Sequence, residues 1–388
     1  MICPYEPGKS IEEVRRELGL SRVIKLASNE NPLGPSPRVI DALAPSSLEL
    51  HMYPDQEGHC LQSALGRWLD VAPEQIVVGA GSTEIMRLLA DAYLRPGDEA
   101  LMADLCFPVY ETVTRVAGGR PVVVPLDEAL GYDLEAMLAA ITRRTKLVFL
   151  ASPNNPTGAR IPCADLQHFV ARLPSTVLCV LDLAYAEYVE GAAAEALELA
   201  TRHSNLVLLF TFSKVYGLAG LRVGYAVANR DVASWLKRVR IPFTISTAAQ
   251  VAARVALEDR DHVRRTLALN RRSRELLVRQ SPDLGLAVRG SGANFVLLEC
   301  PAESEEMSRR LLRRGIVVRP MRHPRLARCV RVTTGTEEQT GAFLEAVRDL
   351  AVPRADGAAA PAAAAPSAGT GPELPADLAR LPRGFLGC

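Results

Sequence analysis

Short apolar runs alternate with amphipathic segments from about residue 74 onward, and this alternation predicts strands separated by helices. Several of the runs are apolar at nearly every position, which is typical of strands covered by helices on both faces. Between them, segments such as 82–94 and 163–173 carry apolar residues at helical spacing. The pattern predicts an α/β fold with a mainly parallel, seven-stranded sheet and right-handed crossovers. The candidate strands are 75–80, 99–104, 120–126, 146–152, 176–182, 205–212 and 222–228.

After the predicted sheet, from about residue 246, strands and helices no longer alternate in this way. A long helical stretch rich in Ala and Arg covers about 246–280, and a smaller α+β unit comes after it, ending in a helix at about 351. From residue 352 the chain is rich in Ala, Pro and Gly, which is typical of a disordered tail. We therefore expect four parts: an N-terminal arm that contributes to the small domain and the substrate site (1–40), a large domain (41–275), a small domain (276–351) and the tail (352–388).

The composition narrows the class of protein. The chain of 388 residues is 48% hydrophobic and 23% charged, as in an ordinary globular enzyme. Its net charge of +1 gives no reason to expect nucleic acid or a membrane as a partner, and no apolar run approaches the roughly 20 residues of a membrane span.

The eight cysteines and the N-terminus bear on location and on metal binding. The cysteines form no Cys-x-x-Cys pair, which argues against a metal site, and their scattered placement is typical of a reduced compartment. The charged N-terminus lacks the apolar core of a signal peptide. We predict a cytoplasmic protein without a metal.

One lysine stands out at a predicted strand end. Lys214 follows the run 205–212 and lies close to Thr211, Ser213 and Arg222. Hydroxyl groups and a guanidinium together suit a phosphate. A lysine amine beside a phosphate site can form a Schiff base with an aldehyde cofactor. The ends of parallel strands are also where such sheets bind ligands.

Two other strand ends carry polar residues that suit the same ligand. A glycine-rich turn precedes a predicted helix start at Ser82 and Thr83, whose free N–H groups would face an anion. Asp182 ends the run 176–182 in apolar company, and the nitrogen of a pyridinium ring would be a suitable partner for its carboxylate. Tyr185 lies three residues further on.

A third turn, at 152–158, presents Asn154 and Asn155 between prolines and a glycine. Each of these features taken singly also has an ordinary structural interpretation, as a helix cap or a turn residue. Their combination at successive strand ends favours a binding site.

The motifs that contain these residues resemble those of a known enzyme family. SPNNPTG (152–158), LDLAYAEY (181–188) and TFSKVYGLAGLRVGY (211–225) resemble the pyridoxal-phosphate (PLP) aminotransferases of the aspartate-aminotransferase fold group, fold type I. The N-terminal motifs at 4–20 and 24–37, with MYPD, GIVVRPM and VRVTTGT, are similar to the histidinol-phosphate aminotransferase branch, which also contains aromatic aminotransferases. The resemblance covers about residues 3–350.

The resemblance implies a cofactor, an assembly and a reaction. The cofactor would be PLP, the assembly a homodimer, and the reaction a ping-pong transfer of an amino group from a small-molecule donor to a 2-oxo acid. Lys214 would hold the cofactor as a Schiff base and then move the α-proton, and Asp182 would pair with the pyridine nitrogen. Asn155 and Tyr185 would hydrogen-bond the ring oxygen, while Phe107 stacks on the ring.

The resemblance also assigns the anion contacts. The cofactor phosphate would be held by Ser82, Thr83, Thr211, Ser213 and Arg222, with Tyr53 reaching it from the other subunit. The substrate would be bound by Tyr5, Arg319 and Arg331.

Two positions depart from the family pattern and leave the donor open. Leu183 stands where the family usually has an acidic residue, and Thr244 stands where the branch usually has Asn. The first choice is transfer from L-histidinol phosphate to 2-oxoglutarate, in histidine biosynthesis. The alternatives are an aromatic or other specialised aminotransferase, a PLP decarboxylase or lyase, and a non-catalytic homologue. A non-catalytic homologue would have no physical reason to keep all four of Lys214, Asp182, Tyr185 and Arg222.

Overall fold

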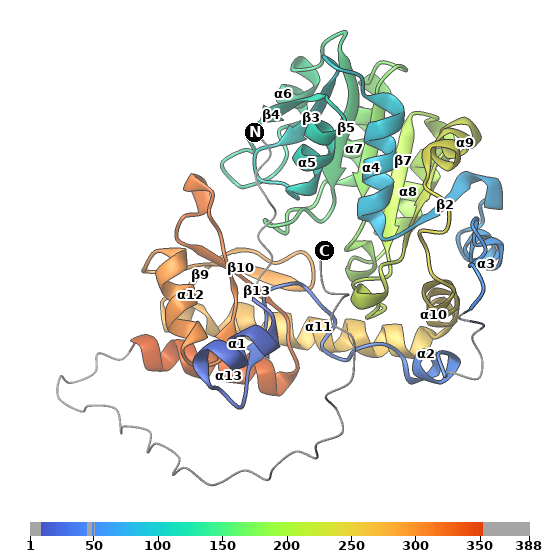
Figure 1. Ribbon diagram of the computed structural model, residues 1–388. Helices are drawn as coiled ribbons and strands as arrows, with labels where there is room; N and C mark the ends of the chain where they lie inside the picture. The colour runs from blue at the N-terminus through green and yellow to red at the C-terminus, as the bar shows by residue number, and fades with distance from the viewer. Residues whose placement is uncertain (1–8, 45–48, 50, 352–388) are drawn as a thin grey trace, which may run out of the picture. The chain divides into compact units, whose positions relative to one another are not determined.

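The computed structural model describes residues 9–44, 49 and 51–351 (Figure 1). Its central feature is a seven-stranded sheet with the order β2-β8-β7-β6-β5-β3-β4. β8 runs antiparallel to both of its neighbours, and the other strands are parallel to one another. The predicted α/β fold with a mainly parallel sheet is confirmed. The strands are β2 (Ile76–Gly79), β3 (Glu99–Ala103), β4 (Arg120–Val124), β5 (Thr145–Ala151), β6 (Leu178–Asp182), β7 (Leu206–Thr211) and β8 (Gly224–Val227).

Apolar side chains cover both faces of this sheet, because alternate residues of a strand point to opposite sides. In β7, Leu208 belongs to the core on one face and Leu209 to the core on the other. The first face packs against α3 (His59–Leu69), α6 (Leu134–Ala139), α7 (Cys163–Arg172), α8 (Ala192–Arg202) and α10 (Thr247–Glu258). The second packs against α4 (Ser82–Tyr93), α5 (Val109–Val116) and α9 (Arg230–Val239).

The predicted helical stretch at 246–280 consists of two helices. α10 ends at Glu258 and α11 (Arg260–Gln280) begins after Asp259, whose carboxylate accepts a hydrogen bond from the His262 N–H. The same carboxylate accepts a bond from the Ser36 hydroxyl, and this bond holds the pKa of Asp259 below its usual value. An N-cap aspartate in mid-stretch is therefore the reason for the break.

A second sheet, of four antiparallel strands in the order β12-β13-β10-β9, packs against α11, α12 (Ser304–Leu312) and α13 (Glu337–Ala351). The N-terminal segment joins this part of the chain, because β1 (Ile24–Lys25) pairs in parallel with β11 (Ile316–Val317). The strands of the second sheet are β9 (Ala287–Gly290), β10 (Phe295–Glu299), β12 (Arg319–Pro320) and β13 (Cys329–Thr333).

Two short helices complete the N-terminal segment. α1 (Ile11–Leu18) begins at a capping box between Ser10 and Glu13 and ends at Gly19, which has a left-handed φ of 64°. α2 (Pro37–Ala42) begins at Ser36, whose hydroxyl accepts the Arg38 N–H. In the described residues, no helix is long and apolar enough to cross a membrane.

The contacts within the chain do not test the predicted domain boundaries. Residues up to Ala351 form one compact unit by their contacts, so the boundaries at 40 and 275 stay predictions. The predicted tail, 352–388, lies outside the described residues.

Candidate active site

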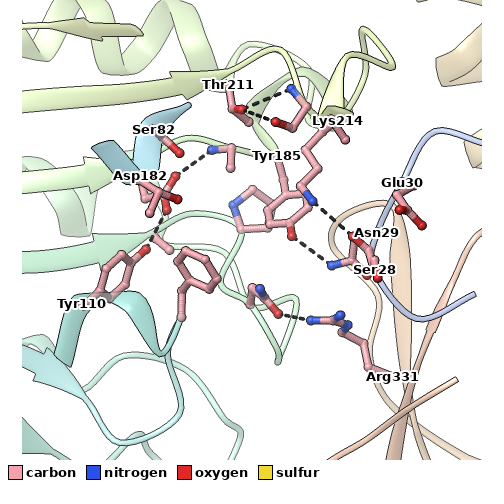
Figure 2. A pocket seen from close by; sticks show the side chains of 18 of the residues that line it. Ser28, Asn29, Glu30, Ser82, Tyr110, Asp182, Tyr185, Thr211, Lys214 and Arg331 are labelled. Atoms are coloured by element: carbon pink, nitrogen blue, oxygen red, sulfur yellow. Dashed lines mark hydrogen bonds between the residues drawn. The ribbon is translucent and has the colours of Figure 1, made fainter. Parts of the chain in front are cut away.

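The loops after β2, β3, β5, β6 and β7 enclose a cavity of about 260 Å³ at the carboxyl ends of these strands (Figure 2). Parallel strands bring these ends to the same edge of the sheet, so residues far apart in sequence meet there. Most of the residues predicted from the sequence line this cavity: Ser82, Thr83, Phe107, Asn155, Asp182, Tyr185, Thr211, Ser213, Lys214, Arg222 and Arg331.

One end of the cavity is an anion cradle. The Thr211 hydroxyl lies 3.0 Å from Ser213 Oγ, and Arg222 Nη1 lies 3.4 Å from the same oxygen. α4 begins here at Ser82, so its first N–H groups face the same region. Hydroxyls, free N–H groups and a guanidinium together form a site for a phosphate.

Two glycines make the close approach of these groups possible. A Cβ atom at Gly81 would lie 2.7 Å from Arg222 Nη2, and one at Gly224 would lie 2.6 Å from the Ser82 nitrogen. Gly81 also has a φ of 79°, which side chains rarely adopt. The cradle therefore depends on the absence of side chains at both positions.

Lys214 lies between this cradle and the N-terminal segment. Its Nζ donates a hydrogen bond of 3.3 Å to the Ser28 carbonyl and lies 5.6 Å from the centre of the Tyr185 ring. Figure 2 shows the amine directed toward the middle of the cavity. The amine can therefore contact a ligand whose phosphate is bound in the cradle.

Asp182 is the last residue of β6 and is 6% exposed. It accepts hydrogen bonds from the Tyr110 hydroxyl at 2.8 Å and from the Ala184 N–H at 3.1 Å. Burial raises the pKa of Asp182, while these two bonds and the nearby Lys214 lower it. A buried carboxylate of this kind suits a cationic ring nitrogen as its partner.

Tyr110 was not predicted as a site residue, although the motif LCFPVY contains it. Its ring is fully buried, stacks on Phe149 with centroids 4.9 Å apart, and meets Phe107 edge-on at 5.8 Å. The apolar spacing of α5 gives it the pattern of a core residue. The structure places it in the site, because Tyr110 lines the cavity and its hydroxyl contacts Asp182.

Three residues of the N-terminal segment, Ser28, Asn29 and Glu30, also line the cavity and were not predicted individually. The Asn29 amide donates a hydrogen bond of 2.9 Å to Tyr185 Oη. Burial raises the pKa of the Tyr185 hydroxyl, so it keeps its proton at neutral pH. The motif at 24–37 was the signal that could have found these residues.

Arg331, on β13, is the cationic side chain at the opposite end of the cavity from the cradle. It is 9% exposed, and its guanidinium donates hydrogen bonds to Asn155 Oδ1 and to the Ala27 carbonyl, the latter at 2.7 Å. Arg331 also lines an adjacent cavity of about 680 Å³, together with Arg319. The structure thus places the two predicted substrate arginines around neighbouring cavities.

The two asparagines of the turn at 152–158 differ in their surroundings. Asn155 lines the cavity, whereas Asn154 is buried beneath it. The Asn154 amide donates to the Leu105 carbonyl at 2.8 Å and accepts from the Tyr132 hydroxyl at 3.1 Å. Asn154 therefore supports the turn, and Asn155 faces the ligand space.

Two predicted residues remain, and the first of them, Tyr53, is not among the described residues that line either cavity. Tyr53 is 82% exposed and stacks on Phe243, with ring centroids 4.8 Å apart. Tyr5 lies outside the described residues.

The two positions that depart from the family pattern, Leu183 and Thr244, lie in different surroundings. Leu183 is buried in the core beneath the sheet. The Thr244 hydroxyl donates to Glu84 Oε2 at 3.1 Å, in the first turn of α4 and so near the cradle.

Comparisons with known proteins agree with this geometry. The family model described as aminotransferase class I and II matches residues 21–347. A histidinol-phosphate aminotransferase of Caldicellulosiruptor saccharolyticus is 42% identical over 352 residues, covering 90% of this chain and 98% of the relative. The enzyme of that name from Moorella thermoacetica is 44% identical over 351 residues, covering 90% and 91%.

Solved structures agree as well. The histidinol-phosphate aminotransferase of Sinorhizobium meliloti in complex with pyridoxal-5'-phosphate has a TM-score of 0.83 and 31% identity, covering 89% of this chain and 95% of that one. A Thermus thermophilus aspartate aminotransferase has a TM-score of 0.73 and 27% identity, covering 88% and 94%. The fold group and the aminotransferase prediction are confirmed: the chain belongs to the class I and II aminotransferase family.

Proposed function

We propose that this chain is a PLP-dependent aminotransferase that transfers the amino group of L-histidinol phosphate to 2-oxoglutarate, giving imidazole acetol phosphate and L-glutamate in histidine biosynthesis. The observation that carries the choice of donor is the set of relatives at 42–44% identity over 90% of the chain, which bear the name histidinol-phosphate aminotransferase.

The residues around the cavity fit PLP. The cradle of Ser82, Ser213 and Arg222 suits its phosphate, the buried Asp182 carboxylate suits its ring nitrogen, and the Lys214 amine suits its aldehyde. Gly81 and Gly224 allow Arg222 and the Ser82 N–H to come close enough to form this cradle, because a Cβ at either position would collide with these groups. When bound, PLP supplies an electron sink for the pair left on the donor's α-carbon.

Each side chain then has a role of its own. Asp182 holds positive charge on the ring nitrogen, and Tyr185 and Asn155 bind the ring oxygen. Phe107 covers one face of the ring. The amine of the donor displaces Lys214 Nζ from the cofactor aldehyde carbon. The freed Lys214 Nζ would then take the proton from the donor's α-carbon and deliver it to that carbon of the cofactor.

The arginines at the other end of the cavities would bind the anionic groups of the substrates. Arg331 is nearly buried, so an anion that reaches it loses contact with water. The planar guanidinium can replace that water by donating two parallel hydrogen bonds. Arg319, at the neighbouring cavity, provides a second cation for a substrate with two charged ends. We propose that Tyr5 completes this region.

We also propose a homodimer in the cytoplasm, in which Tyr53 of one subunit reaches the phosphate site of the other. The exposure of Tyr53 and its stacking on the half-exposed Phe243 support this proposal, because a large exposed aromatic pair favours a protein contact.

A half-reaction screen tests the function. The enzyme loaded with PLP is mixed with one candidate donor at a time, without any oxo acid, and the loss of absorbance of the Lys214-bound cofactor is followed. We expect fast conversion by histidinol phosphate and little by phenylalanine or tyrosine. Conversion by aromatic amino acids alone would refute this donor and direct attention to Thr244. No conversion by any donor would favour a decarboxylase, a lyase or a non-catalytic homologue.

A further inference from the structure

Asn29 is held in an unusual backbone conformation by residues far away in sequence. It is 1% exposed and has a left-handed φ of 55°. Its N–H donates to Thr333 Oγ1 at 2.9 Å, and its carbonyl accepts from the Asn294 amide at 2.9 Å. A non-glycine residue keeps such a conformation only where its surroundings fix it, and these positions are often functional.

The hydrogen bonds of Asn29 also fix which way its amide points. Thr333 Oγ1 already accepts the Asn29 N–H, so its single proton is free to be donated, and it lies 3.1 Å from Asn29 Oδ1. The opposite orientation would take the Oδ1 acceptor away from the Thr333 proton and turn the Asn29 NH₂ toward an oxygen that already accepts the Asn29 N–H. The NH₂ group of Asn29 is therefore the end that faces Tyr185 Oη, at 2.9 Å.

This contact constrains the Tyr185 hydroxyl. Because Tyr185 Oη accepts a hydrogen bond from Asn29, its only proton must point in another direction. The ring itself is buried and meets Phe295 edge-on at 5.5 Å, so it has little freedom to turn. In Figure 2 the hydroxyl lies in the cavity, between the Asn29 amide and the space beside Lys214.

We propose that Asn29 is a positioning residue: by donating to Tyr185 Oη, it directs the Tyr185 proton toward the ring oxygen of the cofactor. The inference rests on the proposed PLP function. It extends the site to Thr333, which holds the Asn29 amide in place from the strand that carries Arg331.

The test uses the holoenzyme and the variant Asn29→Gly, since glycine tolerates the left-handed backbone while removing the amide. The measured quantity is the midpoint pH at which the absorbance of the Lys214-bound cofactor changes. A proton donated to the ring oxygen stabilises negative charge there and favours the deprotonated linkage, so a weaker donor moves the midpoint upward. We expect a rise of about half a pH unit, which corresponds to part of one hydrogen bond.

A double-mutant cycle separates this role from general loss of stability. Tyr185→Phe should raise the midpoint further than Asn29→Gly, and adding Asn29→Gly to Tyr185→Phe should change nothing more. Asn270→Ala is the matched control, because Asn270 is buried, accepts from Thr334 at 2.7 Å, and has no hydrogen bond to Tyr185 among those of the described residues. Its midpoint should equal that of the wild type.

A second variant covers the case in which Asn29→Gly does not fold. Thr333→Val keeps the shape of the side chain and removes the hydroxyl that orients the amide; it should raise the midpoint, and Thr333→Ser should restore it. The inference is overturned if Asn29→Gly or, failing that, Thr333→Val keeps the wild-type midpoint while Tyr185→Phe shifts it, or if the effects of Asn29→Gly and Tyr185→Phe add. A wild-type protein without the cofactor absorbance would instead refute the proposed function itself.

Discussion

Replacing Tyr110 by Phe removes one hydroxyl group and leaves the rest of a buried ring in place. The stacking on Phe149, with planes 4° apart, does not involve the hydroxyl, so the variant should fold. What is lost is the 2.8 Å hydrogen bond to Asp182 Oδ2. A hydrogen bond to a charged group contributes about 1.5 to 3 kcal/mol, so we expect the free energy of unfolding to fall by this amount while Asp182 is ionised.

The size of the loss should depend on pH, with a sign that follows from the pKa of Asp182. Burial raises this pKa, and the Tyr110 bond is the first of the groups that lower it, so the variant should have a still higher value. A carboxyl group with a raised folded pKa stabilises the fold at low pH and loses that contribution as the pH rises through the folded pKa. Tyr110→Phe should lose more of this stabilisation than the wild type, so the difference between their free energies of unfolding should grow with pH.

Urea unfolding of the cofactor-free protein at several pH values between about 4 and 8 measures this difference. Tyr132→Phe is the matched control, because its hydroxyl donates to Asn154 at 3.1 Å and accepts from the Ala151 N–H at 3.0 Å, both neutral groups. Its loss should be about 1 kcal/mol at every pH. A Tyr110→Phe loss below about 0.5 kcal/mol at neutral pH, or one that does not change with pH, would refute the reasoning.

Three further outcomes are expected. Lys214→Ala should abolish both turnover and the absorbance of the Lys214-bound cofactor, and normal turnover in this variant would contradict the assignment. Mixed dimers of Tyr53→Phe and Lys214→Ala subunits should regain the activity of one intact site; if they regain none, Tyr53 does not complete the neighbouring subunit. Burial raises the pKa of Glu187 from 4.5 to about 8, so its contribution to stability should decline as the pH rises between these values. Glu187→Gln should therefore remove this decline in urea unfolding, and an unchanged profile would show that Glu187 is not the cause.

The amino-acid pattern alone determined the sheet and much of the cofactor site. The apolar run of β6 ends at Asp182 and that of β7 ends at Thr211, so the polar residues beyond them lie at the same edge once the strands are parallel. The turn before Ser82 is predictable for the same local reason, since glycines and a free helix start occur together in the sequence. These features depend on neighbours along the chain, which periodicity records.

Only the tertiary structure decided the contacts between distant segments. Asn154 and Asn155 occupy the same turn, and the packing beneath it determines that Asn155 faces the cavity. The hydroxyl of Tyr110 meets a carboxylate 72 residues away, and the Asn29 amide meets a hydroxyl 156 residues away. Periodicity indicates which face of an element is buried. It carries no information on which atom of another element lies opposite, because that depends on how the strands, helices and N-terminal segment pack together.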